Sequence, residues 1–181
     1  MTMQLHRIQA KLFLENPEEL DMEALIPVFH SWIQEQAFEE LLIDVANYAH
    51  VPDGPGVMLI AHEADYGIDL AYGRPGLIYT RKRDVPEDTA EAIGLALGQV
   101  LQAADRLEDE TDLTFDRNEI EVIFLDRLQV PNEAASLDLL RDSLESALGA
   151  SFPDADPHLE WTERDRRMPF GVRALLKPVA A

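Results

Sequence analysis

The chain has 181 residues, 46% of them hydrophobic, and it contains no cysteine, which excludes disulfides, thiolate metal sites, iron–sulfur clusters and a cysteine nucleophile. Its 35 acidic and 15 basic residues give a formal net charge of −20, which opposes binding to nucleic acid and to anionic membranes. The length favours a single α+β domain over residues 1–181, and the lack of a signal-like or membrane-spanning apolar stretch predicts a soluble, cytoplasmic protein.

The first quarter of the chain predicts a strand, a helix and a second strand. Imperfect apolar alternation indicates a strand over residues 4–15. Asp21 is placed to cap a helix through residue 36, although Pro27 is compatible only if the regular helix starts near it or its first turn is distorted. Residues 41–48 are predicted to form a buried strand.

The middle of the chain predicts an antiparallel meander followed by a long helix. Short connections rich in glycine and proline separate three further strands, expected over residues 57–64, 66–72 and 77–83. Asp88 begins the clearest helix, because Glu91 follows three residues later as its partner in a capping box.

The last third predicts a strand, a helix and a hairpin. Residues 119–128 are apolar on both alternating faces, as in a central strand. Asn132 is predicted to cap a helix that ends at Gly149. Two strands, over residues 158–164 and 170–177, complete the chain.

The order strand, helix, strand, strand therefore occurs twice, over residues 4–64 and 119–177. The similarity lies in the pattern and not in residue identity, and it suggests a pseudo-duplicated β-α-β-β unit. Two such units would place helices on one face of a mainly antiparallel sheet. The fold expected from the sequence is a ferredoxin-like two-layer sandwich of the α+β class.

Histidines and carboxylates are concentrated between residues 44 and 69 and form the main candidate site. If the strands on either side of the loop at residues 50–56 pair, His50 and His62 can approach each other. With Asp44 and Glu63 they are the candidates for acid–base catalysis, since histidine titrates near neutral pH. The alternative is that these are ordinary loop and strand residues.

The same region is also the candidate for a metal site. Two imidazoles and a carboxylate suit non-haem iron, manganese or zinc, so a divalent metal is the expected cofactor if there is one. The candidate ligands are His50, His62, Glu63 and Asp65. The loop Asp53-Gly54-Pro55-Gly56 offers backbone amides to an anion, but a rigid turn accounts for it better.

Basic side chains are scarce, so their clusters stand out. Arg81 and Arg83, with Arg74 nearby, are candidates for binding a carboxylate or phosphate of a ligand. They would otherwise balance local acids at the end of a sheet. Arg164, Arg166 and Arg167 form a similar but more turn-like cluster.

The segments IPVFHSWIQ, LLIDVANYAHVPDGPGV and GLIYTRKR lie within the first half of the chain. Together they resemble an uncharacterised bacterial protein family of unknown function. The resemblance implies no activity and assigns no residue a role.

Two functions follow as hypotheses. The first is a binding domain that self-associates or binds a protein partner through an exposed edge or an open face of its sheet. The alternative is a small metal-dependent or acid–base enzyme that uses the candidate site, with the arginines holding an anionic substrate. An architecture of this kind hosts many functions and does not choose between them.

Overall fold

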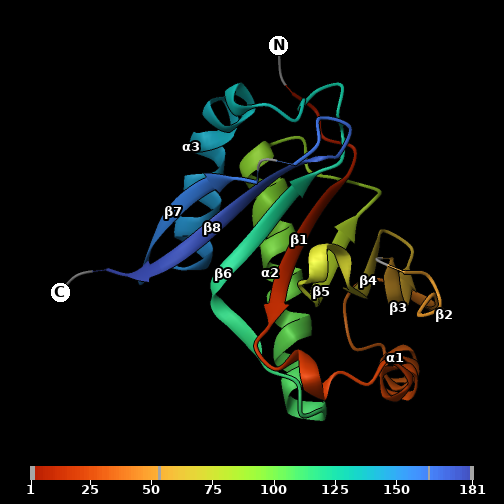
Figure 1. The fold of residues 1–181 in the computed structure, drawn as a ribbon. Coiled ribbons are helices and arrows are strands. Elements are labelled where there is room, and N and C mark those ends of the chain that lie inside the picture. Colours follow the sequence, from red (N-terminus) through yellow and green to blue (C-terminus); the bar gives the residue numbers. More distant parts are fainter. Residues whose placement is uncertain (1–2, 53, 163, 180–181) are drawn as a thin grey trace.

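The computed structural model describes residues 3–52, 54–162 and 164–179. Within these residues the chain forms one eight-stranded sheet and three α-helices (Figure 1). The strands are β1 (Ile8–Leu14), β2 (Leu42–Asn47), β3 (Pro55–Ala61), β4 (Ala64–Asp69), β5 (Gly76–Arg81), β6 (Phe115–Phe124), β7 (Ala155–Trp161) and β8 (Phe170–Pro178). The helices are α1 (Met22–Glu35), α2 (Thr89–Glu110) and α3 (Ala134–Ser151), with short 3-10 turns η1 (Pro17–Glu19) and η2 (Ala71–Gly73).

The strand order in the sheet is β2-β3-β4-β5-β1-β6-β8-β7, and every neighbouring pair is antiparallel. The predicted α+β class and mainly antiparallel sheet are therefore confirmed. The central strands β1 and β6 begin two similar runs of chain. After β1 come α1 and a four-stranded meander that returns β5 to the side of β1, and after β6 come α3 and a hairpin that returns β8 to the side of β6.

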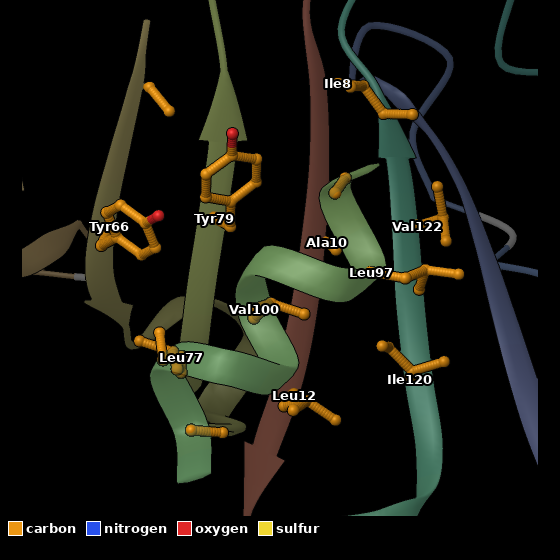
Figure 2. Packing of buried hydrophobic residues seen from close by; sticks show 14 of the residues in the cluster. Ile8, Ala10, Leu12, Tyr66, Leu77, Tyr79, Leu97, Val100, Ile120 and Val122 are labelled. Carbon is orange, nitrogen blue, oxygen red and sulfur yellow. The ribbon is translucent and has the colours of Figure 1, made fainter. Parts of the chain in front are cut away.

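The hydrophobic core lies between the helices and one face of the sheet. The stripe of α2 that includes Leu97 and Val100 packs over Ala10 of β1, and over Tyr79 and Val122 of the two flanking strands (Figure 2). Trp32 of α1 belongs to the same cluster of buried side chains, which extends across the sheet. The burial of apolar surface on this face is the main source of stability, and it leaves the opposite face of the sheet without a helical cover.

The helix starts follow from their capping residues. The Asp88 carboxylate accepts a hydrogen bond from the Glu91 backbone amide, as predicted. The Asp21 carboxylate accepts bonds from the amides of residues 23 and 24, so α1 begins at Met22. The predicted cap at Asp21 is confirmed, and Pro27 lies inside the helix. Of the two conditions expected for Pro27, a regular helix that starts near it is therefore wrong. The proline ring has no N–H to donate there, and the packing of Phe29 and Trp32 offsets that loss.

The sheet ends at β2 on one side, which corrects the prediction that residues 41–48 form a buried strand. β2 pairs with β3 alone and is an edge strand. Leu42 is buried, but Leu41 and Ile43 are 58% and 53% exposed. The run of apolar residues indicated burial on both faces, whereas strand order put this segment at the margin.

Within the described residues, no helix is both long and apolar enough to cross a membrane.

Candidate functional site

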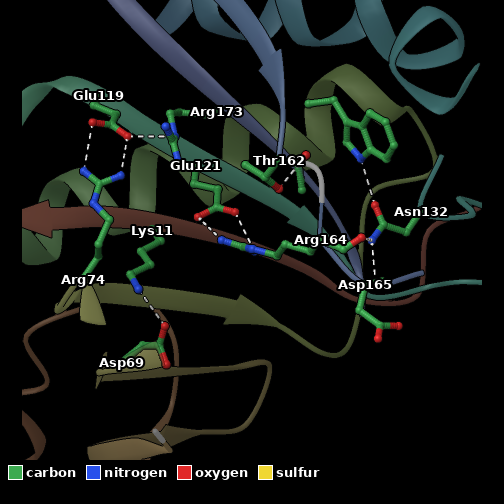
Figure 3. Close-up of polar contacts among 12 residues, drawn as sticks. Lys11, Asp69, Arg74, Glu119, Glu121, Asn132, Thr162, Arg164, Asp165 and Arg173 are labelled. Carbon is green, nitrogen blue, oxygen red and sulfur yellow. Dashed lines mark hydrogen bonds and ion pairs between the residues drawn. The ribbon is translucent and has the colours of Figure 1, made fainter. Parts of the chain in front are cut away.

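The face of the sheet opposite the helices carries a group of ion-paired side chains. On β1 the residues that alternate with the core positions are Gln9, Lys11 and Phe13. Their neighbours on this face include Glu119 and Glu121 of β6, which Figure 3 shows beside Arg173 of the next strand. Charged side chains at the middle of a sheet are costly to bury unless they are paired, and all of these are.

A pocket of about 310 Å³ opens on this face, and we call it the open-face pocket. Strands β1, β6 and β8 form its floor, and the turn around η2 and the loop after β7 form its walls. Its volume is at the small end of the range for ligand sites. The side chains that matter most for its chemistry are Lys11, Phe13, Tyr72, Arg74, Arg164 and Arg173.

Two arginines at the pocket share one carboxylate. Arg74 Nη1 and Nη2 donate to Glu119 Oε1 and Oε2 at 2.7 and 3.0 Å, which is the two-pronged geometry of a guanidinium on a carboxylate. Arg173 Nε lies 2.9 Å from the same Oε1 atom. The hydrogen bonds from Arg74 lower the pKa of the Glu119 carboxyl group and keep it ionised. One negative charge is thus shared between two positive charges.

The carboxylate of a second ion pair is almost completely buried. Arg164 Nη1 and Nη2 lie 2.8 and 3.1 Å from the two oxygens of Glu121, whose side chain is 1% exposed. A Cβ atom at Gly171 would lie 2.5 Å from Thr162 Oγ1 and 2.8 Å from Glu121 Oε1. Such distances are too short for atoms that are not bonded, so this position requires glycine if the pair is to keep its place.

Lys11 makes the third ion pair, from beneath the pocket. Its Nζ atom donates to Asp69 Oδ2 at 2.7 Å, and its side chain is 3% exposed. The ring of Phe13, on the same strand, has the Arg74 guanidinium stacked 3.8 Å from its centroid. Stacking of this kind holds a guanidinium in one plane and leaves its edge available for hydrogen bonds.

Tyr72 forms part of the wall from the turn between β4 and β5. Its φ angle of 61° lies in the left-handed region, which is uncommon for a residue other than glycine. Its ring is 54% exposed and lies 4.1 Å from the Arg164 guanidinium. The strained turn therefore places an aromatic ring over an arginine that is bound to a buried glutamate.

The loop that carries Arg164 is held by Asn132, for which the sequence predicted a different role. Asn132 is 5% exposed, and its amide donates to the backbone carbonyls of Arg164 and Asp165 and accepts from the Trp161 indole N–H. The predicted helix cap at Asn132 is wrong, because α3 begins two residues later. Its amide group instead anchors the loop after β7.

The open-face pocket has the chemistry of a binding site. Its cations are a lysine and three arginines, and one of its hydroxyls, Thr162 Oγ1, already donates to the carbonyl of Gly171. Guanidinium groups with fixed orientation recognise oxyanions through paired hydrogen bonds. The arrangement is suited to hold an anionic group against the sheet.

The predicted catalytic pair is not brought together. His50 is exposed in the turn that follows β2, and His62 is exposed in the turn that follows β3. These turns lie at opposite ends of β3, a seven-residue strand that spans roughly 20 Å. The two imidazoles therefore cannot share one metal ion or one substrate atom.

The acidic candidates are dispersed as well. Asp44 is exposed on β2, and Asp65 on β4 pairs with Lys82 at 2.7 Å. Glu63 is half-buried in the turn beside His62. Across residues 3–52, 54–162 and 164–179, no group of three or more possible ligands lies close enough to hold a metal ion. Asp53 of the glycine–proline loop lies outside the described residues.

The three predicted anion-binding arginines have different positions. Arg74 lines the open-face pocket. Arg83 is exposed, with Nη1 3.4 Å from His62 Nδ1. Arg81 lies on the helix-covered face, where Nη1 donates to the buried Glu40 carboxylate at 3.0 Å. A ligand would have to displace Glu40 to reach Arg81.

The Glu40 carboxylate accepts two further hydrogen bonds. The hydroxyls of Tyr66 and Tyr79 donate to its two oxygens at 2.9 and 2.5 Å. Burial and the neighbouring Glu40 charge raise the pKa of both tyrosines far above its ordinary value, so they remain protonated donors. This network satisfies a buried carboxylate and fixes the end of the sheet against the helices.

Several residues of the open-face pocket were not selected from the sequence. The missed residues are Lys11, Glu119, Glu121 and Arg173, and Arg164 was noted without a role. Each of the four missed residues is a charge at an alternate position within an apolar strand, on β1, β6 or β8. That pattern was the available signal, but only strand order shows that the charges meet.

No known protein-family model matches the chain, and no curated protein shows significant sequence similarity to it.

Proposed function

We propose that the protein is a binding domain whose open-face pocket takes the anionic group of a ligand. The ligand is either a small molecule or an exposed group of a protein partner. The observation that carries the proposal is the sharing of the Glu119 carboxylate between Arg74 and Arg173. Two positive charges face one negative charge, so one positive charge is not neutralised. Both arginines line a pocket, in a chain whose net charge is −20.

The net charge of the protein favours a ligand with one anionic group over a polyanion such as nucleic acid. A nucleic acid or an anionic membrane would be repelled by the net charge of −20. A single anion that enters the pocket is surrounded instead by cations at short range. We therefore retain the expectation that neither nucleic acid nor membrane is a partner.

Pairing at the sheet edges is the weaker basis for an interaction domain. The Tyr48 amide donates to the Gly56 carbonyl of β3, and along an antiparallel strand every second amide faces the same neighbour. The Val45 amide, three residues earlier, therefore points to the free edge. That amide donates to the Asp44 carboxylate at 2.8 Å. On the opposite edge, Pro157 has no N–H to donate. These features oppose self-association through the edges.

The enzyme alternative has one observation in its favour. Glu63 Oε2 and Arg81 Nε are both buried without a hydrogen-bond partner in the described structure, and both residues line a second pocket of about 300 Å³. A half-buried carboxylate with a free oxygen can act as a general base. The role of Glu63 remains a prediction, and the binding function has more geometric support.

Two finer expectations belong to the same proposal. A ferredoxin-like relation between the two halves is supported by the matching order of a strand, a helix and a returning meander after β1 and after β6. The sheet of eight strands in the described residues is larger than a ferredoxin-like fold needs. Cytoplasmic location is the second expectation, and fractionation of the host cell tests it.

A thermal melt with simple oxyanions tests the proposed function. Formate, acetate, phosphate and sulfate are added to wild type, Arg173→Gln and the control Arg141→Gln, which removes an arginine from the exposed face of α3. A ligand at about 100 times its Kd adds roughly 2.7 kcal/mol, or on the order of 5–10 °C in Tm. We expect a saturable shift with at least one anion, which Arg173→Gln loses and Arg141→Gln keeps.

The opposite results are equally clear. Equal, unsaturable shifts in all three proteins would contradict a site in the pocket. The same melt with a chelator and then with manganese, iron(II), zinc and calcium examines the alternative. A shift with a transition metal that His62→Ala abolishes would favour the metal-dependent enzyme.

A further inference from the structure

We infer that the anionic group held in the open-face pocket is a single carboxylate, in preference to phosphate or sulfate. The inference rests on the proposed function and specifies the chemistry of its ligand. Three features of the pocket lead to it: the balance of charge, the hydrogen-bond donors of Arg173, and the origin of the walls.

The charge balance leaves room for one negative charge. Among the ion-paired groups, the cations Lys11, Arg74, Arg164 and Arg173 face the carboxylates Asp69, Glu119 and Glu121, four positive against three negative charges. Asp116 forms none of these ion pairs and acts on Arg74 more weakly than either glutamate. A monocarboxylate neutralises the difference. A dianion such as phosphate or sulfate brings a second charge next to glutamates that are 14% and 1% exposed, where repulsion is poorly screened.

Arg173 supplies the donors. Its Nε atom lies beside Glu119, and its side chain is 34% exposed. Within the described residues, the ion pair of Arg173 is made by Nε and not by its two terminal amino groups. Arg74, by contrast, uses both of its terminal amino groups on Glu119. A planar guanidinium edge offers two parallel donors to the oxygens of a carboxylate or of a phosphate. The donors of Arg173 therefore indicate where the anion binds, and the charge balance and the walls favour a carboxylate.

The walls lack the usual features of a phosphate site. Phosphate is commonly bound by several backbone amides at the N-terminus of a helix or in a glycine-rich loop. Here the described lining residues come from β1, β6, β8, the turn around η2 and the loop after β7, and none begins an α-helix. The buried ring of Phe13 adds an apolar surface, which suits the carbon attached to a carboxylate.

The test compares anions on the full-length protein at matched ionic strength. The probes are sodium acetate, benzoate, phosphate and sulfate, and the readout is the ¹H–¹⁵N signal of the arginine Nε–H groups. We expect the Arg173 signal to shift saturably with the carboxylates, at Kd values at least about tenfold lower than with phosphate or sulfate. Arg173→Lys keeps the charge but loses the planar fork and the Arg173 signal, so its anion binding is followed by the shift in Tm. This variant should lose the preference for carboxylates, whereas Arg141→Gln should keep it in both readouts.

Two further probes identify the carrier of the carboxylate. A short peptide with a free C-terminus is compared with the same peptide as its C-terminal amide. Tighter binding of the free peptide than of acetate indicates a peptide terminus, and equal binding indicates a small molecule. Both results support a monocarboxylate.

The outcomes that overturn the inference differ from those that overturn the function. If phosphate or sulfate binds as tightly as the carboxylates and the binding depends on Arg173, the pocket binds anions and the assignment to a carboxylate is wrong. If no anion shifts the Arg173 signal saturably, the inference and the proposed function both fail.

Discussion

Gly171 is the residue on which the buried half of the open-face pocket depends. Its missing side chain leaves the space in which Glu121, Thr162 and Arg164 meet. The ion pair between Glu121 and Arg164 is buried, and buried pairs tolerate little displacement, because a separated charge loses its partner without regaining water. The sequence alone gives no sign that this glycine differs from others.

Replacement of Gly171 by alanine is therefore predicted to destabilise the fold. The added methyl group overlaps Thr162 Oγ1 and Glu121 Oε1, and overpacking of this kind costs about 1–3 kcal/mol. The matched control is Gly94→Ala in α2, where no atom lies within 4 Å of the new Cβ, and a gain of about 0.5–1 kcal/mol is expected. Urea unfolding of the three proteins measures both effects. A Gly171→Ala protein as stable as wild type would show that the loop carrying Arg164 yields freely.

At the scale of elements, strand order explains which charged residues become neighbours at the candidate site and which strand lies exposed at the sheet edge. β1 lies at the middle of the sheet between β5 and β6, so Lys11 and Glu121 become neighbours although 110 positions separate them. β2 lies at the edge, and the apolar side chains of Ile43 and of Leu41, the residue before the strand, are exposed there. An edge strand of this composition is prone to pair with another chain unless it is blocked.

Asp44 is predicted to be the residue that blocks the β2 edge. Its carboxylate accepts the hydrogen bond of the Val45 amide and puts a negative charge beside it. Asp44→Ala frees that amide and removes the charge, so we expect a concentration-dependent rise in molecular mass. Asp142→Ala removes the same charge from an exposed position on α3 and should stay like wild type. Analytical ultracentrifugation of the wild type and the two variants measures their masses. Identical masses at every concentration would show that Asp44 does not block the β2 edge.

For the whole molecule, the net charge of −20 acts against compactness. The carboxylates on the surface repel one another at low ionic strength, and folding brings them closer together. The same field repels anions until they come within a short distance of the arginines.

Stability is predicted to rise with salt at neutral pH. A change from about 0.01 M to about 1 M NaCl shortens the Debye length from about 30 Å to about 3 Å and screens the repulsion. Each kcal/mol gained raises the Tm by about 2–4 °C for a chain of this size. The increase should largely disappear near pH 4.4, the isoelectric point, where the net charge is small. A Tm that is independent of salt at pH 7 would show that repulsion contributes little to stability.

The sequence by itself determined the elements and the class of the fold. The eight strands and three helices occur where alternation, helical spacing and capping residues predict them, with bounds shifted by a few residues. These signals are local: the Asp88 cap and the apolar stripe of α2 are complete within a few turns of chain. The charge likewise led to the expectation that nucleic acid and anionic membranes are not partners, and that expectation stays a prediction.

The tertiary structure alone decided which residues form a site. His50 and His62 are close in sequence and lie at opposite ends of β3, whereas Lys11, Glu121 and Arg173 are distant in sequence and meet on one face. The physical reason is that antiparallel pairing fixes neighbours by strand order and register, and neither is encoded in the residues of one strand. Periodicity shows which face of a strand a charge occupies, but not which strand will lie beside it.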